Sequence, residues 1–236
     1  MSSNSNPLYL NFWPIVSKIW LQKFNITPIL YYIDENHDVK IDETHGIVKR
    51  LKPVKNVPIY LQCLWVRYWS FSEHSNDVCI ISDIDMFPLS QEYFIDSISH
   101  IKDKYVHLNP CLDSYGTLPS CYHISKGSLF SEILSLDSSF DVSVKALNDL
   151  NIGGGPKEQW FADERFSSKK ILDYQKENPN SVVLLPRKGG QNGRRIDRTN
   201  WQYDSKKLSE GYYYDSHSIR PYLNHKTDID EMLKHL

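Results

Sequence analysis

The chain has 236 residues, which is within the range of one large α/β domain, and hydrophobic residues make up 40% and aromatic residues 13% of it. This composition excludes intrinsic disorder over most of the chain. The 27 basic and 29 acidic side chains give a formal net charge of -2. Such a balance excludes a protein whose main task is to coat nucleic acid or an anionic membrane. We therefore predict a single domain, residues 1–236, in which any site for an anion is local.

The four cysteines are widely spaced, and none of them forms a C-x-x-C pair. This spacing argues against a zinc site and against a disulfide framework. The first six residues lack the basic start of a secretory signal, and polar residues interrupt the following apolar stretch long before it could span a bilayer. We therefore expect a cytoplasmic protein with reduced cysteines, no integral membrane segment and no nucleic acid partner.

Apolar residues recur with helical spacing from about residue 12 to 24 and again over residues 61–68. Short β-rich runs predict strands at 28–33, 46–51 and 78–81. A helix at about 91–101 and strands at 105–108 and 121–124 continue the alternation. This order of elements predicts an open, mostly parallel, Rossmann-type sheet flanked by helices.

Beyond residue 125 we predict helices at about 129–136 and 160–171 and a last strand at 182–185. The triple glycine at 153–155 matches neither phosphate-binding glycine motif, and we interpret it as a loop. The stretch from Arg187 to Arg198 carries five basic residues against one acid. It could contact nucleic acid, close over a diphosphate or form a solvated turn, and the acidic net charge argues against the first of these.

Asp83 and Asp85 follow the apolar strand predicted at 78–81. Because side chains at positions i and i+2 of a strand point the same way, both carboxylates could project into the crevice at the carboxyl edge of the sheet. Oxygen ligands in this arrangement suit Mg²⁺ or Mn²⁺, which completes its coordination with substrate phosphates and water. The alternative is an acidic loop that caps a helix beginning near Ser90. The position after a buried strand favours the metal site.

Four segments in the same order resemble the GT-A nucleotide-sugar glycosyltransferases. Ile80–Leu89 resembles the D-x-D region of that family, and Asn6–Trp20 is similar to the segment that leads into its first helix. Trp160–Glu164 is similar to its later acidic motif at the acceptor side, and Tyr214–Pro221 to its C-terminal stretch. The resemblance covers about residues 6–222 and is greatest to chlorella-virus members that build capsid glycans.

The resemblance implies a GT-A-like fold and the transfer of a sugar from a nucleoside diphosphate, UDP- or GDP-linked, to a hydroxyl of a glycan acceptor. It also implies that Asp83, Asp85 and His217 hold Mn²⁺ or Mg²⁺ against the donor diphosphate. Asp215 and His225 are the competing candidates for the third ligand. The cationic side chains that we expect at the diphosphate are Arg195, Arg198 and Arg220.

Sugar transfer needs a group that takes the proton of the acceptor hydroxyl or stabilises an oxocarbenium-like centre, and a carboxylate can do either. We predict that Asp163 and Glu164 are the catalytic residues. Because they are adjacent, their side chains diverge by about 100° on a helix, and only one is expected to face the site. The alternative is an ordinary solvated helix face.

We expect the nucleotide on the N-terminal part of the domain, about residues 1–110. Its predicted contacts are Ser3, Asn4, Asp34 and Asp83. A full first strand normally precedes the base site in GT-A domains, whereas only three residues precede Asn4 here. Residues 111–210 are expected to form the acceptor side, and residues 211–236 a clasp that orders when metal and diphosphate bind.

Two other classes of function remain open from the sequence. The acidic pair could hold Mg²⁺ in a nucleotidyltransferase or a phosphohydrolase, and the chain could be a catalytically silent sugar- or nucleotide-binding module. A glycosyltransferase requires an acceptor glycan for turnover. A binding module binds the nucleotide without any turnover.

Overall fold

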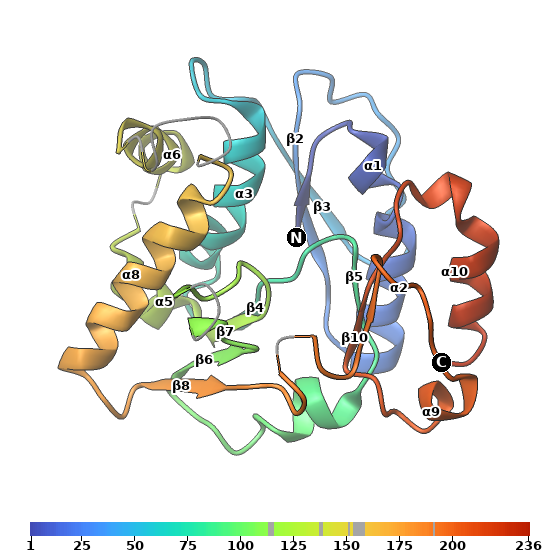
Figure 1. Cartoon of the computed structure of the whole chain (residues 1–236). Coiled ribbons are helices and arrows are strands. Elements are labelled where there is room, and N and C mark those ends of the chain that lie inside the picture. Colours follow the sequence, from blue (N-terminus) through green and yellow to red (C-terminus); the bar gives the residue numbers. More distant parts are fainter. Residues whose placement is uncertain (113–115, 137–138, 151, 153–158, 191) are drawn as a thin grey trace.

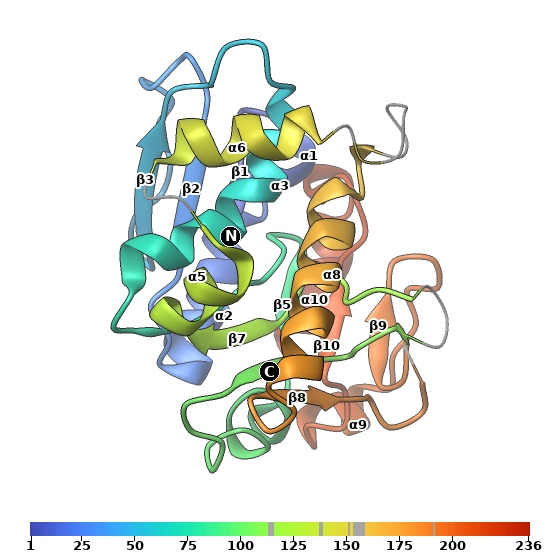
Figure 2. The same cartoon turned by 90° about the vertical axis from the view of Figure 1, so that its left-hand side faces the viewer.

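A computed structural model describes the whole chain except residues 113–115, 137–138, 151, 153–158 and 191. The triple glycine interpreted as a loop lies outside the described residues. Strands lie between two groups of helices (Figure 1). One group consists of α3 (Ile59–Trp69), α5 (Gly127–Leu134), α6 (Phe140–Asp149) and α8 (Ala162–Glu177), and Figure 2 views the molecule from that side. The other side carries α2 (Trp13–Phe24) and α10 (Lys226–Leu233).

The described strands form three sheets. The first is parallel throughout and has the order β1-β2-β3, with β1 at Ser2–Ser3, β2 at Ile29–Ile33 and β3 at Ile47–Leu51. The second has the order β4-β7-β6-β8, with β4 at Val78–Ile80, β7 at His123–Lys126, β6 at Tyr105–Leu108 and β8 at Val182–Leu185. In this sheet β7 runs antiparallel to β4 and β6, whereas β8 runs parallel to β6.

The third sheet joins the middle of the chain to its C-terminal part. Its order is β5-β10-β9, with β5 at Met86–Pro88, β10 at Asp215–His217 and β9 at Arg195–Asp197. Strand β10 is antiparallel to β5 and parallel to β9. Short helices complete the described chain: α1 (Pro7–Leu10), α9 (Ser205–Ser209), and single turns at Ser70–His74, Glu92–Asp96 and Tyr222–Asn224.

The α/β class is confirmed, and a parallel three-stranded sheet is present. The sequence predicts one open, mostly parallel sheet, whereas the described strands form three sheets. β7 runs antiparallel to both of its neighbours, and β5 pairs with β10 from the C-terminal part of the chain. The strand expected at 121–124 begins two residues later, at His123. Tyr122 has a φ of 67°, a left-handed conformation that interrupts extended backbone at this position. The helix expected at 91–101 is shorter and covers Glu92–Asp96 as a wide π-type turn.

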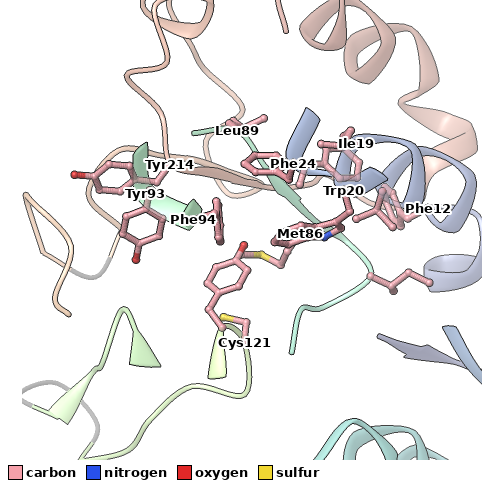
Figure 3. Close-up of a cluster of buried hydrophobic side chains, with 14 of the residues drawn as sticks. Phe12, Ile19, Trp20, Phe24, Met86, Leu89, Tyr93, Phe94, Cys121 and Tyr214 are labelled. Atoms are coloured by element: carbon pink, nitrogen blue, oxygen red, sulfur yellow. The ribbon is translucent and has the colours of Figure 1, made fainter. Parts of the chain in front are cut away.

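Helix α2 shows why its sequence folds as predicted. Pro14 lies in the first turn, where its missing N–H is not needed, and Asn25 ends the helix in a left-handed conformation with φ of 53°. The buried face of α2 packs aromatic rings into one hydrophobic core (Figure 3). There the ring of Phe94 meets Trp20 at 5.3 Å and Phe24 at 5.8 Å, both edge to face.

The C-terminal residues belong to this same core. Tyr214 stacks on Tyr93 with ring centroids 4.1 Å apart, and Ile229 and Met232 of α10 are fully buried. Strand β10 is the central strand of its sheet. Residues 211–236 therefore pack into the core of the domain, and their predicted ordering on binding of metal and diphosphate stays a prediction.

A second hydrophobic core lies under α3, α5, α6 and α8 and contains Trp65, Tyr68 and Phe130. This second core packs α3 and α8 together with Ile81, the residue that follows β4. Along the described chain, no helix is both apolar enough and long enough to span a bilayer.

Candidate active site

One cleft of about 550 Å³ brings together residues from all four segments singled out in the sequence. The N-terminal residues contribute Ser3 and Asn4, and the loop between β4 and β5 contributes Asp83 and Asp85. Glu164 reaches the cleft from the first turn of α8. The cationic and imidazole groups that line it are Arg67, Arg195, Arg198, His217 and Arg220.

A larger cavity of about 900 Å³ lies between β2 and β4 and is bordered by Met1. Its two acidic lining residues, Asp77 and Asp103, are exposed. The smaller cleft, in contrast, contains the buried carboxylate of Asp85, which faces Arg198, His217 and Arg220. Perturbed, partly buried charges are typical of functional sites, so the smaller cleft is the candidate.

Asp85 is the centre of the cationic end of the cleft. Its side chain is 6% exposed, and its Oδ2 accepts a hydrogen bond of 3.1 Å from Nη1 of Arg198. Nη1 of Arg220 lies 3.6 Å from the same oxygen, and Nε2 of His217 lies 3.8 Å from it. One carboxylate therefore faces two guanidinium groups and one imidazole.

Strand pairing explains why these residues meet. His217 pairs with Met86 of β5, so it lies beside Asp85, the residue before that strand. On its other side His217 pairs with Asp197 of β9, so Arg198 lies next to it. Residues that are far apart in the chain are thus neighbours in one sheet.

The imidazole of His217 contacts a group at each nitrogen. Nδ1 lies 3.4 Å from a carboxylate oxygen of Asp197, and Nε2 accepts a hydrogen bond from Arg198. Burial lowers the pKa of His217 below its usual value, although the charge of Asp85 opposes this shift. Near neutral pH the ring is therefore uncharged, the form in which histidine binds metal ions.

Asp83 contacts Arg67 of α3, a residue that was not among the predicted site residues. Arg67 lies in α3 with its side chain 5% exposed, contacts Asp83 through Nη1, and lies 3.4 Å from Asp163 through Nη2. Burial alone would lower the pKa of Arg67, but Asp83 and Asp163 raise it above its ordinary value, so the charge is retained. A single arginine inside the apolar run from Leu61 to Trp69 was the available signal, because a buried cation requires an anionic partner.

The two predicted catalytic carboxylates occupy different environments. Asp163 is 1% exposed and accepts a hydrogen bond of 3.0 Å from Oγ of Ser120, whereas Glu164 lines the cleft. Oγ1 of Thr117 donates a hydrogen bond of 2.6 Å to Glu164. Burial raises the pKa of both carboxyl groups. Glu164 thus combines access to the cleft with an increased affinity for a proton.

Other predicted residues are engaged elsewhere. Asp34 lies outside the set of cleft-lining residues and accepts hydrogen bonds from the backbone N–H groups of Ser5 and Asn36, at 3.1 and 3.0 Å. Arg195 borders the cleft, but its guanidinium donates to the buried carboxylate of Asp215 at 3.0 and 2.8 Å. His225 lies at the start of α10, where Nδ1 is 3.8 Å from Asp228.

Asp215 also contacts Arg187, so this carboxylate is committed to two arginines. Burial alone would raise its pKa, but the two guanidinium groups hold the pKa well below its usual range. Its side chain has no exposed surface. Asp215, the alternative candidate for the third metal ligand, therefore serves as the buried counter-ion of Arg187 and Arg195.

The predicted metal ligands fit a divalent ion in type. Within the described part of the chain, no three His, Cys, Asp or Glu side chains converge closely enough to hold a metal ion, since Asp83 turns toward Arg67. Asp85 and His217 nevertheless offer a carboxylate oxygen and a neutral imidazole nitrogen 3.8 Å apart, a donor set acceptable to Mn²⁺. The guanidinium of Arg198 bridges these two donors, so an ion there and Arg198 would compete for the same partners.

Comparison with known proteins does not identify a family for this chain. The models of known protein families do not match the chain, and neither do the curated proteins. The function of the cleft is therefore inferred from its chemistry.

Proposed function

We propose that the chain is a metal-dependent, GT-A-like glycosyltransferase that moves a sugar from a nucleoside diphosphate to a hydroxyl of a glycan acceptor. The observation that carries the proposal is the surroundings of Asp85. A neutral imidazole and two guanidinium groups lie within 4 Å of this carboxylate or are hydrogen bonded to it, in the cleft that Glu164 also lines. This combination supplies cations for a departing diphosphate and a base for an incoming hydroxyl.

The donor diphosphate is proposed to lie at the cationic end of the cleft. Arg198 and Arg220 are partly exposed there, with 25% and 29% of their side chains accessible, and can exchange Asp85 for phosphate oxygens. Asp85 and His217, with Asp83 from the same loop, would hold Mn²⁺ or Mg²⁺. When bound, such an ion would supply Lewis-acid stabilisation of the charge on the leaving diphosphate. Ser3 and Asn4 place the nucleoside along the N-terminal rim.

Glu164 is proposed as the general base. Its raised pKa makes it a stronger acceptor for the proton of the acceptor hydroxyl, and its hydrogen bond from Thr117 fixes the carboxylate. Arg67 and Asp163 are proposed to position the site without contacting the substrate. Arg67 pairs with both Asp83 and Asp163 and so holds the loop of Asp83 against the first turn of α8. This arrangement keeps a fixed distance and orientation between the bound donor and the bound acceptor.

Donor binding is tested by thermal unfolding with a panel of nucleoside diphosphates, with Mn²⁺ or with EDTA. We expect one nucleoside diphosphate to raise Tm in Mn²⁺ and to lose this effect in EDTA and in Asp85→Asn. Asp77→Asn, an exposed aspartate at the larger cavity, is the matched control and should behave like the wild type. Equal binding in EDTA or by Asp85→Asn would disprove the metal-dependent donor site.

Transfer is tested with the sugar-linked form of the nucleotide that binds. A glycosyltransferase releases nucleoside diphosphate much faster when an acceptor glycan is added. A phosphohydrolase is recognised by cleavage of the diphosphate itself, and a binding module by the absence of turnover with any acceptor.

A further inference from the structure

The part of the cleft formed by the first turn of α3 and the residues before α8 is aromatic. Tyr60, Trp160 and Phe161 line the cleft there, and Trp160 and Phe161 expose 43% and 47% of their surface. Large aromatic side chains are rarely left this open beside one another without a ligand or partner, because their burial is strongly favourable. Their exposure inside a cleft points to contact with a ligand.

The aromatic end is held in place. The rings of Tyr60 and Trp160 stack with centroids 5.8 Å apart and an interplanar angle of 27°. The hydroxyl of Tyr60 donates a hydrogen bond of 2.9 Å to Oε1 of Gln159. Tyr60 belongs to the first turn of α3, and Phe161 is the residue that precedes α8. Two packed helices therefore fix the orientation of the rings before any ligand arrives.

Groups that bind hydroxyls lie next to the rings. Glu164 lies three residues beyond Phe161, in the first turn of α8, and Ser120 lines the same cleft. The ligand best suited to this combination has an apolar C–H face for the rings and hydroxyl groups at its edge for the carboxylate. A pyranose has both, since the electron-rich face of an aromatic ring attracts polarised C–H groups.

We propose that Tyr60, Trp160 and Phe161 form a platform that binds a pyranose unit of the acceptor through its C–H face. The inference rests on the proposed function, because it assigns this end of the cleft to the acceptor. The cations suited to a diphosphate, Arg198 and Arg220, come from other segments and surround Asp85. The carboxylate of Glu164, which lies three residues beyond Phe161, repels phosphate and accepts hydrogen bonds from sugar hydroxyls.

Tryptophan fluorescence reports directly on the platform. Of the six tryptophans, Trp13, Trp20, Trp65 and Trp69 are buried and Trp201 is half-buried, so acrylamide quenches mainly Trp160. The probes are methyl pyranosides of glucose, galactose, mannose and xylose, and sorbitol serves as an open-chain polyol without a ring face. We expect at least one pyranoside, and not sorbitol, to protect Trp160 from acrylamide.

Phe161→Ala tests the contact without removing the fluorophore. We expect about fivefold to tenfold weaker pyranoside binding in this variant, as loss of one ring contact implies. Tyr212→Ala removes an aromatic ring of similar exposure outside the cleft and should bind as the wild type does. Nucleoside diphosphate binding in Mn²⁺ should be unchanged in Phe161→Ala, which also shows that the variant is folded.

The inference and the proposed function fail in different ways. Pyranoside protection that depends on Phe161 supports the platform even when no transfer is detected. Transfer with an unchanged acceptor KM in Trp160→Ala and Phe161→Ala overturns the platform and leaves the glycosyltransferase intact. Protection by nucleosides that is lost in Phe161→Ala, or the absence of protection by every pyranoside, also overturns the platform.

Discussion

Two buried clusters of arginine and aspartate join distant parts of this chain, and their compositions are opposite. In the first, one arginine lies between two aspartates, and in the second, one aspartate lies between two arginines. Both link segments that are far apart in the sequence and bring charge into the interior. The first cluster consists of Arg67, Asp83 and Asp163, and the second of Arg187, Arg195 and Asp215.

Access separates the two clusters. The side chain of Asp83 is 35% exposed and lines the cleft, so a ligand can take the place of water or of Arg67 beside it. The side chains of Arg187 and Asp215 have no exposed surface, so no ligand reaches them. Arg195 of the second cluster borders the cleft, but its side chain is only 8% exposed and is paired with Asp215. A buried charge network therefore indicates a site only where a member is exposed enough to exchange its partner for a ligand.

The largest effect is expected from Asp215→Asn. The substitution leaves two buried guanidinium groups without their anion, a change that typically costs about 3–5 kcal/mol of folding free energy. Urea unfolding should show a much lower midpoint. Asp173→Asn removes an exposed aspartate that also contacts two cations, Lys169 and Lys176, and should leave the midpoint unchanged. Equal midpoints for the two variants would contradict a structural assignment of the second cluster.

A loss of rate without a loss of stability is expected from Glu164→Gln. Removal of a general base should lower sugar transfer by at least ~10²-fold, about 2.7 kcal/mol, with Tm and donor binding retained. Burial raises the pKa of Glu164, so the wild-type rate of transfer should begin to fall, as the pH is lowered, at a higher pH than the pKa of an ordinary glutamate would give. The pH–rate profile of the variant should lack this decrease. Asp163→Asn, inside the first cluster, should lower Tm as well. Transfer at the wild-type rate by Glu164→Gln would exclude it as the base.

Metal affinity is expected to change in opposite directions at two neighbouring residues. His217→Ala removes a donor and should weaken Mn²⁺ binding about tenfold, about 1.4 kcal/mol. Arg198→Gln removes the cation that bridges Asp85 and His217 and should strengthen Mn²⁺ binding when no donor is present. Calorimetric titration measures both. His225→Ala, a partly exposed histidine outside the cleft, should match the wild type, and equal loss in His225→Ala and His217→Ala would contradict the assignment.

The smallest effect concerns two buried histidines that belong to neither cluster. Nε2 of His107 and of His123 each lie 2.9 Å from the carbonyl oxygen of Pro119, and because a carbonyl only accepts, both Nε2 atoms carry a proton. Burial lowers the pKa of His107 to about 4 and that of His123 well below its usual value, so both rings are neutral in the fold.

Stability should therefore be complete above about pH 6.5, the pKa of unfolded histidine, and should fall as the pH drops toward 4. Each histidine contributes a slope of at most about 1.4 kcal/mol per pH unit. In His107→Gln the slope between pH 6 and 5 should be reduced by up to this amount, measured by urea unfolding. A variant with the same slope as the wild type would mean that His107 titrates normally in the fold.

Local sequence patterns were sufficient to predict the helices and strands that bury a continuous set of apolar side chains. The apolar period of α2 and α3 and the β-rich runs of β2, β3, β6 and β8 gave these elements within two or three residues. Strands β9 and β10 escaped prediction because each has only three residues and carries charged side chains. Their extended form depends on pairing with β5 and with each other, and no local preference reveals that.

The sequence by itself determined the α/β class, most long elements, and which residue types could act: the pair Asp83 and Asp85, the pair Asp163 and Glu164, and the histidine at 217. Only the tertiary structure decided how these residues are arranged and with which groups they are paired. The register of β10 places His217 and Arg198 beside Asp85. Asp163 is buried, Glu164 lines the cleft, and the guanidinium of Arg195 is paired with Asp215 although Arg195 borders the cleft. Charges act over a few ångströms, and which charges come that close depends on strand register and burial, which contacts between distant segments establish.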